Sequence, residues 1–171
     1  MAGSGGSMPS GTEGDIPSGW DVQVLGGTTD NSWRVFSKTA DDKLKIEINI
    51  PQGNGDAGVI LYQAASSPDT AVNYIAEVEI EVESLSSNVN ALIFEIREEG
   101  GAAGNIYHAV LDELSGSPAH LSGRGVLRTP EINLASDATK ARARLIIEGS
   151  SASAPVIATI IVHGIRLVAV S

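Results

Sequence analysis

The segment 74–83 alternates between apolar and acidic side chains with a period of two. Successive side chains of a β-strand point to opposite faces of its sheet. The pattern therefore predicts a long strand with one face on a dry core and the other in water. A chain with such strands favours an antiparallel sheet, because antiparallel sheets tolerate one solvated face.

The same alternation recurs through most of the chain, with turn residues between the runs. Residues 43–50 place their even-numbered positions inward, and Leu92, Phe94 and Ile96 point inward from residues 90–97. Ala141, Ala143, Leu145 and Ile147 share one face of 139–148, and Gly164 is expected to form a bulge in a strand over 156–170. Further strands are expected at 20–25, 32–37, 57–64, 105–111 and 126–134, with a short helix as an alternative within 112–124. The expected fold is an all-β antiparallel β-sandwich of the jelly-roll type.

The composition suits one such domain with an extended arm. Hydrophobic residues make up 42% of the 171 residues and aromatic residues only 4%, so the core is expected to be aliphatic. Residues 19–171 are assigned to a single sandwich domain. Residues 1–18 form a Gly/Ser/Pro-rich arm that cannot bury enough apolar area to order itself.

The arm has two interpretations. It is an assembly arm that lies along a neighbouring subunit through Met8, Pro9, Ile16 and Pro17, or its first residues are an artificial linker and Met8 is the true start. An assembly arm would add to a sheet edge of its neighbour through backbone hydrogen bonds.

Charge and residue usage disfavour several partners. The net charge is −10 and no basic patch is visible, so we expect neither nucleic acid nor an anionic membrane as a partner. No apolar run approaches the roughly 20 residues of a membrane helix. Residues 1–14 lack the basic and apolar regions of a signal peptide. Without cysteine, a disulfide scaffold, a thiol nucleophile and a cysteine metal site are excluded.

Four glutamates, at positions 77, 79, 81 and 83, share one face of their strand. Like charges in a row cost stability unless they are balanced. The basic face of 139–148, with Lys140, Arg142 and Arg144, is the expected partner. Such a face is either a solvated cross-strand ion ladder or an acidic contact surface.

The order of the elements resembles the β-sandwich of carbohydrate-binding modules, of the kind attached to xylanases. Pro17-Ser18-Gly19-Trp20 is similar to the opening Pro-x-x-Trp of that family, and Ile60-Leu61-Tyr62-Gln63 to its apolar strand ending in Gln. The remaining similar pieces are 43–46, 74–78, 141–148 and 164–168. The resemblance spans Pro17 to Val168.

The resemblance implies sites as well as a fold. Sugar recognition in that family uses aromatic rings that stack on pyranose faces and polar groups that read hydroxyls. Trp20, Tyr74 and Phe94 are expected to pack in the core or at an edge. The implied ligand-binding residues are Trp33, Tyr62, Gln63, Arg97 and Tyr107. The family also binds a structural calcium through an acidic pair on its last strand, where this chain has His163-Gly164, so no cofactor is expected and calcium is left as an alternative.

No catalytic constellation is visible. The chain lacks a Gly-x-Ser-x-Gly elbow and a His-x-x-x-His pair. Glu95, Glu98, Glu99 and Asp112 are the carboxylates that could be nominated for glycoside hydrolysis, but acidic loop residues are abundant here. We expect a protein that is not an enzyme.

The leading hypothesis is a structural surface protein of an assembly, most simply a bacteriophage decoration, fibre or tail-associated protein on a glycan-binding-module fold. It would be made in the host cytoplasm, sit on the virion surface and bind copies of itself, a capsid or tail protein, or surface glycans. The fold-level part of this argument is an analogy. The alternative is a free-standing carbohydrate-binding module or lectin.

Overall fold

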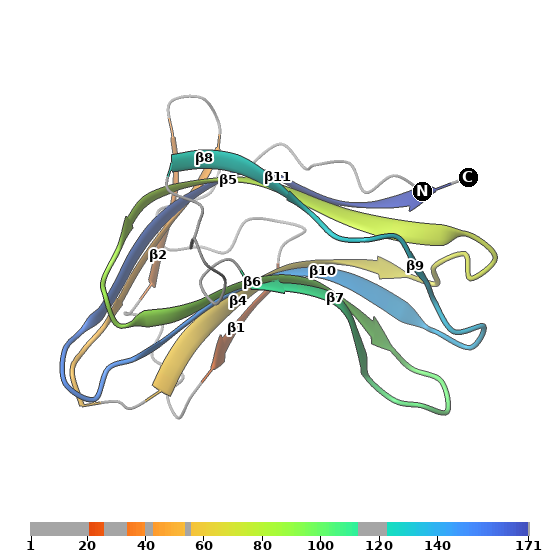
Figure 1. Ribbon diagram of the computed structural model, residues 1–171, viewed down its shortest axis with the longest axis horizontal. Helices are drawn as coiled ribbons and strands as arrows, with labels where there is room; N and C mark the ends of the chain where they lie inside the picture. The colour runs from red at the N-terminus through yellow and green to blue at the C-terminus, as the bar shows by residue number, and fades with distance from the viewer. Residues whose placement is uncertain (1–20, 26–33, 40–42, 54–55, 113–122, 171) are drawn as a thin grey trace.

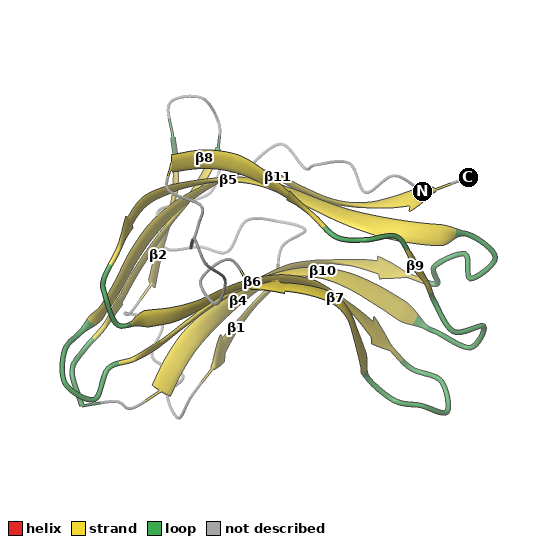
Figure 2. Cartoon of the chain, in the orientation of Figure 1, coloured by secondary structure: helices red, strands yellow, loops and turns green. Residues whose placement is uncertain are grey.

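The computed structural model describes residues 21–25, 34–39, 43–53, 56–112 and 123–170. All paired strands within these ranges are antiparallel, and they form two sheets stacked face to face (Figures 1 and 2). An antiparallel β-sandwich is therefore confirmed. The expected arm, with Met8, Pro9, Ile16 and Pro17, lies outside the described residues, as does most of the segment for which a short helix was considered. The described residues contain no helix long and apolar enough to cross a membrane.

Sheet I has the strand order β1-β4-β10-β6-β7. Its strands are β1 (Asp21–Leu25), β4 (Asp56–Ser66), β10 (Lys140–Ser150), β6 (Val89–Glu99) and β7 (Ile106–Asp112). The sheet arches in Figure 1, with its concave side turned away from sheet II.

Sheet II has the order β2-β3-β11-β5-β8, and the short strand β9 (Ile132–Asn133) also pairs with β5. Its other strands are β2 (Arg34–Lys38), β3 (Leu44–Ile50), β11 (Val156–Val170), β5 (Asn73–Leu85) and β8 (Gly123–Arg128). The expected bulge is confirmed, because the register of β11 against β5 shifts between Val162 and Gly164.

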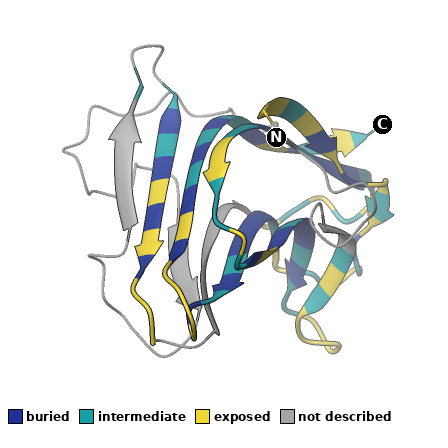
Figure 3. Cartoon of the chain, turned by 60° about the vertical axis from the view of Figure 1, so that its left-hand side comes forward, coloured by how far each residue is buried: buried dark blue, intermediate teal, exposed yellow. Residues whose placement is uncertain are grey.

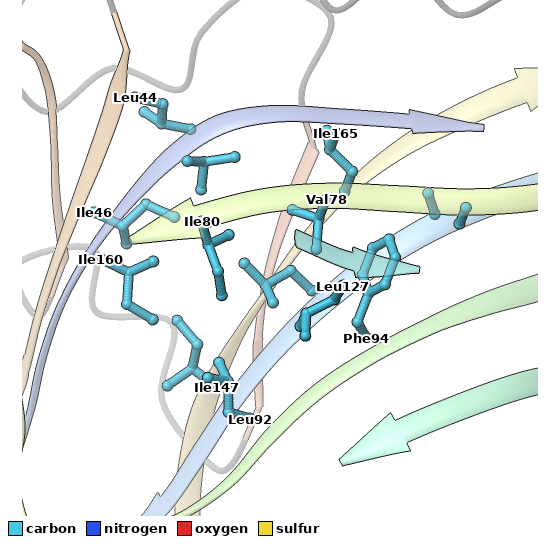
Figure 4. Close-up of a cluster of buried hydrophobic side chains, with 14 of the residues drawn as sticks. Leu44, Ile46, Val78, Ile80, Leu92, Phe94, Leu127, Ile147, Ile160 and Ile165 are labelled. Carbon is cyan, nitrogen blue, oxygen red and sulfur yellow. The ribbon is translucent and has the colours of Figure 1, made fainter. Parts of the chain in front are cut away.

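The core lies between the sheets and follows the alternation of the sequence (Figure 3). Every second residue of β3, from Leu44 to Ile50, is buried. Sheet I contributes Leu92, Phe94 and Ile147, which face Ile80 and Ile160 of sheet II (Figure 4). Each buried aliphatic or aromatic side chain of this kind stabilises the fold by about 1.5–3 kcal/mol, so the inward face of each strand is set by its apolar positions.

Candidate functional site

The outer face of sheet I carries a row of charged side chains around one tyrosine. Its members are Glu95, Arg97 and Glu99 of β6, Tyr107 of β7, and Arg142 and Arg144 of β10. We call this set the arginine face. The register explains why they meet: Arg144 pairs with Glu95, Arg142 with Arg97, and Arg97 with Tyr107. Their neighbours in sequence face the core, so the arginine face lies on the concave side of the sheet.

Tyr107 covers two of the arginines. The guanidinium carbons of Arg97 and Arg144 each lie 5.6 Å from the centre of its ring. Both β6 and β10 lie on the same side of the edge strand β7, so the ring leans across the sheet toward them. Tyr107 is nevertheless 55% exposed, and among the described aromatic side chains it alone is exposed. Cation–π contacts with two arginines therefore hold an accessible aromatic surface over the sheet.

Below this ring lies a buried ion pair. Glu95 is 4% and Arg144 5% exposed, and Nη1 of Arg144 lies 2.8 Å from Oε1 of Glu95. The two atoms are close, but they are not aligned as a hydrogen bond, and neither atom makes another one. Burial raises the pKa of the Glu95 carboxyl, and the positive charges of Arg144 and Arg97 oppose that shift. The pair is thus desolvated beneath the ring, and one hydrogen-bonding atom of each partner stays unsatisfied.

A second carboxylate joins two arginines. Glu99 Oε1 lies 3.2 Å from Nε of Arg97, and Glu99 Oε2 lies 3.0 Å from Nη2 of Arg142. Arg97 and Arg142 are directly opposite each other on neighbouring strands. Two like charges in that position repel, and the shared Glu99 carboxylate compensates them.

The structure brings some of the predicted ligand-binding residues together. Arg97 and Tyr107 are cross-strand neighbours on the arginine face. By backbone register Tyr62 pairs with Arg144, whereas Gln63 pairs with Ala143 in the next row. The side chains of Tyr62 and Gln63 are not described, and Trp33 lies outside the described residues. The assignment of these five residues to a ligand therefore stays a prediction.

Sequence reasoning missed Glu95, Arg142 and Arg144 as members of this face. It assigned the basic side chains of β10 to the four glutamates of β5, and that assignment is wrong. The strands β10 and β5 belong to different sheets. The alternation of Arg142 and Arg144 with alanines did indicate one shared face, but a period of two cannot say which strand lies alongside.

The four glutamates of β5 find their partners within sheet II. Arg128 and Arg166 flank Glu77, and Arg124 contacts Glu79 at 2.7 Å. Nε2 of His163 lies 3.1 Å from Glu81, and Nζ of Lys45 lies 3.2 Å from Glu83. A hydrogen bond from Arg124 lowers the pKa of Glu79. These residues, called the glutamate ladder here, form the expected cross-strand ion ladder with different partners.

The side chains of three nominated carboxylates are described, and these three do not share one face; that of Asp112 is not described. Glu95 and Glu99 lie on the arginine face, whereas Glu98 is 1% exposed on the core side of β6. Oε2 of Glu98 lies 2.9 Å from Nε2 of His108, and the Ala135 N–H donates to the same carboxylate. Within the described ranges, no three acidic or histidine side chains gather in a way that could hold a metal ion.

The fold is similar to solved structures of several kinds. One is a structure described as carbohydrate-binding modules of the β-sandwich superfamily, with a TM-score of 0.61 and 12% identity over 88% of this chain and 57% of that one. Another is tailspike protein 4 of bacteriophage CBA120, with a TM-score of 0.55 and 12% identity over 90% of this chain and 20% of that one. A third is a Stig cyclase from Fischerella sp. TAU, with a TM-score of 0.51 and 12% identity over 91% of this chain and 87% of that one.

At the level of sequence, no protein family and no curated protein matches the chain. The chain spans about a fifth of the tailspike chain and 57% of the carbohydrate-binding chain. At 12% identity, these structural similarities establish a shared fold and nothing beyond it. The chain therefore has the β-sandwich fold of carbohydrate-binding modules. The same sandwich occurs in proteins with different activities, so the function has to be argued from the site.

Proposed function

We propose that this protein is a non-enzymatic glycan-binding module and that the arginine face is its binding site. The observation that carries the proposal is the exposed ring of Tyr107, held across a concave sheet by two arginines. A sugar ring presents an apolar face to an aromatic surface and hydroxyl groups at its rim. Binding sites of this kind combine aromatic surface with a few oriented polar groups.

The polar groups are already in place. The side chains of Arg97, Arg142 and Glu99 are 15–18% exposed, so their outer atoms can meet sugar hydroxyls beside the ring. The Glu95–Arg144 pair, whose unaligned atoms are buried, supports the face from beneath. Because the ion pairs and the ring contacts fix these side chains before binding, little conformational entropy is lost on association. The similarity to carbohydrate-binding modules supports the same function.

The test removes the aromatic surface. Tyr107→Ala is expected to weaken glycan binding at least about fivefold, if a sugar ring stacks on the tyrosine as a nucleic-acid base does, for which stacking contributes on the order of 1–3 kcal/mol. A glycan array followed by titration calorimetry measures the loss. Val126→Ala is the matched control, since Val126 is equally exposed but lies on sheet II. Equal affinity of Tyr107→Ala and the wild type for every glycan bound would overturn the proposal.

We also propose, as the setting of this module, the surface of a larger assembly such as a phage virion. The similarity to a phage tailspike at a TM-score of 0.55 supports this setting. Among the described strands, β7 is an edge of sheet I, and an edge strand can accept an added strand. A free-standing module is the competing form of the same proposal.

Native mass measurement and negative-stain imaging separate the two settings. The full-length chain is compared with a version that lacks residues 1–18. Oligomers that disappear with the arm support the assembly role. Monomers in both samples exclude self-assembly and leave the free-standing module.

A further inference from the structure

The local charge on the arginine face is opposite in sign to the net charge of the whole protein. The whole chain carries a net charge of −10. At one end of the arginine face, however, three basic side chains, Lys140, Arg142 and Arg97, stand around a single carboxylate, Glu99. Local sign and overall sign therefore differ, which a solvated surface of this composition does not require.

The backbone register brings this cluster together. Arg142 is opposite Arg97, and Lys140 is opposite Glu99 in the next row of the same face. Rows of one face are about 7 Å apart along a strand. Lys140 is exposed, and no carboxylate of the described residues forms an ion pair with it. The Glu99 carboxylate thus forms ion pairs with Arg97 and Arg142, and Lys140 lies on the neighbouring strand without forming one.

Among the residues that the structure describes, the other carboxylates of β6 are already engaged and do not pair with Lys140. Glu98 faces the core, where His108 and the Ala135 N–H already engage it. Glu95 lies one row further along the face and is paired with Arg144. Lys140, which has no ion-pair partner among the described carboxylates, consequently places a positive charge on the solvent side of the cluster, where a further anion can bind.

We infer that the ligand is an acidic glycan, whose uronic acid carboxylate binds at Arg97, Arg142 and Lys140 while a sugar ring stacks on Tyr107. This inference rests on the proposed function and narrows its ligand class. Arg97 links the two parts, since it contacts both the Tyr107 ring and Glu99. Arginine favours carboxylates because its planar guanidinium can form two parallel hydrogen bonds with them.

The experiment compares each acidic polysaccharide with its own neutral form. Homogalacturonan, alginate, hyaluronan and xanthan are tested beside their carboxyl-reduced derivatives, together with neutral xylan and mannan and one sulfated galactan. Affinities are measured at about 50 and 500 mM salt, because a contact between exposed charges is screened at the higher value. The acidic form of at least one polysaccharide is expected to bind at least tenfold more tightly than its reduced form at low salt, and this preference is expected to shrink at high salt.

Single substitutions test whether the glycan carboxylate binds at Arg142 and Lys140. Arg142→Gln is expected to lower affinity for the acidic form about tenfold, the loss typical of one charge-assisted hydrogen bond, and to lower affinity for the reduced form much less. Lys140→Gln, at an exposed position that burdens folding little, is expected to reduce the same affinity about threefold. Arg124→Gln makes the same change of charge on sheet II and is expected to have no effect.

The outcomes separate the two proposals. Equal binding of acidic and reduced forms, or a preference confined to the sulfated chain, overturns the uronic acid inference and leaves glycan binding intact. Binding to none of these polysaccharides, and to none on the wider array, overturns the proposed function and the inference with it. A preference for acidic forms that Lys140→Gln and Arg142→Gln both leave unchanged places the carboxylate elsewhere and also overturns the inference.

Discussion

The outer faces of both sheets carry glutamates paired with basic residues, but the two sets differ in burial and in how they share partners. On the glutamate ladder, the side chains of Glu79, Glu81 and Glu83 are 38–41% exposed, and each has its own basic partner on a neighbouring strand. On the arginine face, Glu95 and Arg144 are buried, and two arginines share Glu99. Water screens the first set, so each pair contributes little. The second set is desolvated, so its members depend on one another, and they hold an aromatic ring in place.

The largest expected difference between the two faces is in stability. Arg144→Ala is expected to lower the free energy of unfolding by about 3–5 kcal/mol, because it leaves the buried Glu95 carboxylate without its cation. Urea unfolding followed by circular dichroism measures the change at pH 7. The destabilisation should diminish in acid, where Glu95 becomes protonated and no longer needs a counter-charge.

A double substitution tests whether the unpaired Glu95 charge causes this loss of stability. Glu95→Leu combined with Arg144→Met removes both charges and fills similar volume, so its stability should lie within about 1 kcal/mol of the wild type. If the double variant is as unstable as Arg144→Ala, lost packing rather than the unpaired charge explains the effect. Binding would still be impaired in the double variant, because the polar pair beneath Tyr107 is gone.

The pH dependence of stability should have opposite signs on the two faces. The pKa of Glu79 in the folded protein is lowered below 4.5 by Arg124, so its stabilising contribution is complete above 4.5 and is lost as the pH falls through the folded pKa. The pKa of Glu95 is raised above 4.5 by burial, so the cost of its charge is present at neutral pH and is relieved as the pH falls through that raised value.

Unfolding measured between pH 3 and 8 for the wild type, Glu79→Gln and Glu95→Gln resolves the two contributions. The difference between the wild type and Glu79→Gln should shrink below pH 4.5. The difference between the wild type and Glu95→Gln should shift in favour of the wild type, and this shift should begin above pH 4.5. A shift of the same sign for both residues would contradict the distinction between a screened and a buried face.

The smallest expected effect is a single cut in the glutamate ladder. Arg124→Ala removes the partner of Glu79, and both side chains are more than one third exposed. The loss should be at most about 1 kcal/mol at low salt and should vanish in 1 M sodium chloride, where the screening length is about 3 Å. A larger loss, or one that salt does not change, would show that the ladder is as interdependent as the arginine face.

Sequence patterns predicted the fold well because alternation is a local property. Leu92, Phe94 and Ile96 are buried as predicted, and the bulge at Gly164 was visible as a glycine within an apolar run. Arg97 and Tyr107 were predicted as ligand-binding residues, and they turned out to be neighbours. Trp33 and the arm at Met8 lie outside the described residues, so the predictions about them stay predictions.

The partners of the charged residues were not predictable in the same way. Periodicity says which residues share a face of a strand, but not which strand lies beside it or how deeply that face is covered. It could not show that β5 pairs with β8 and β11 rather than with β10. Nor could it show that Glu95, placed outward by its position, is 4% exposed.

By itself, then, the sequence determined the strands, their apolar faces and the all-β class, because each follows from the preference of nearby residues for water or for a core. Only the tertiary structure decided that Arg144 meets Glu95 beneath Tyr107 and that Arg142 and Arg97 share Glu99. The contacts between β6 and β10 join residues more than 40 positions apart in sequence. They depend on strand order and register, which the packing of the whole sandwich selects.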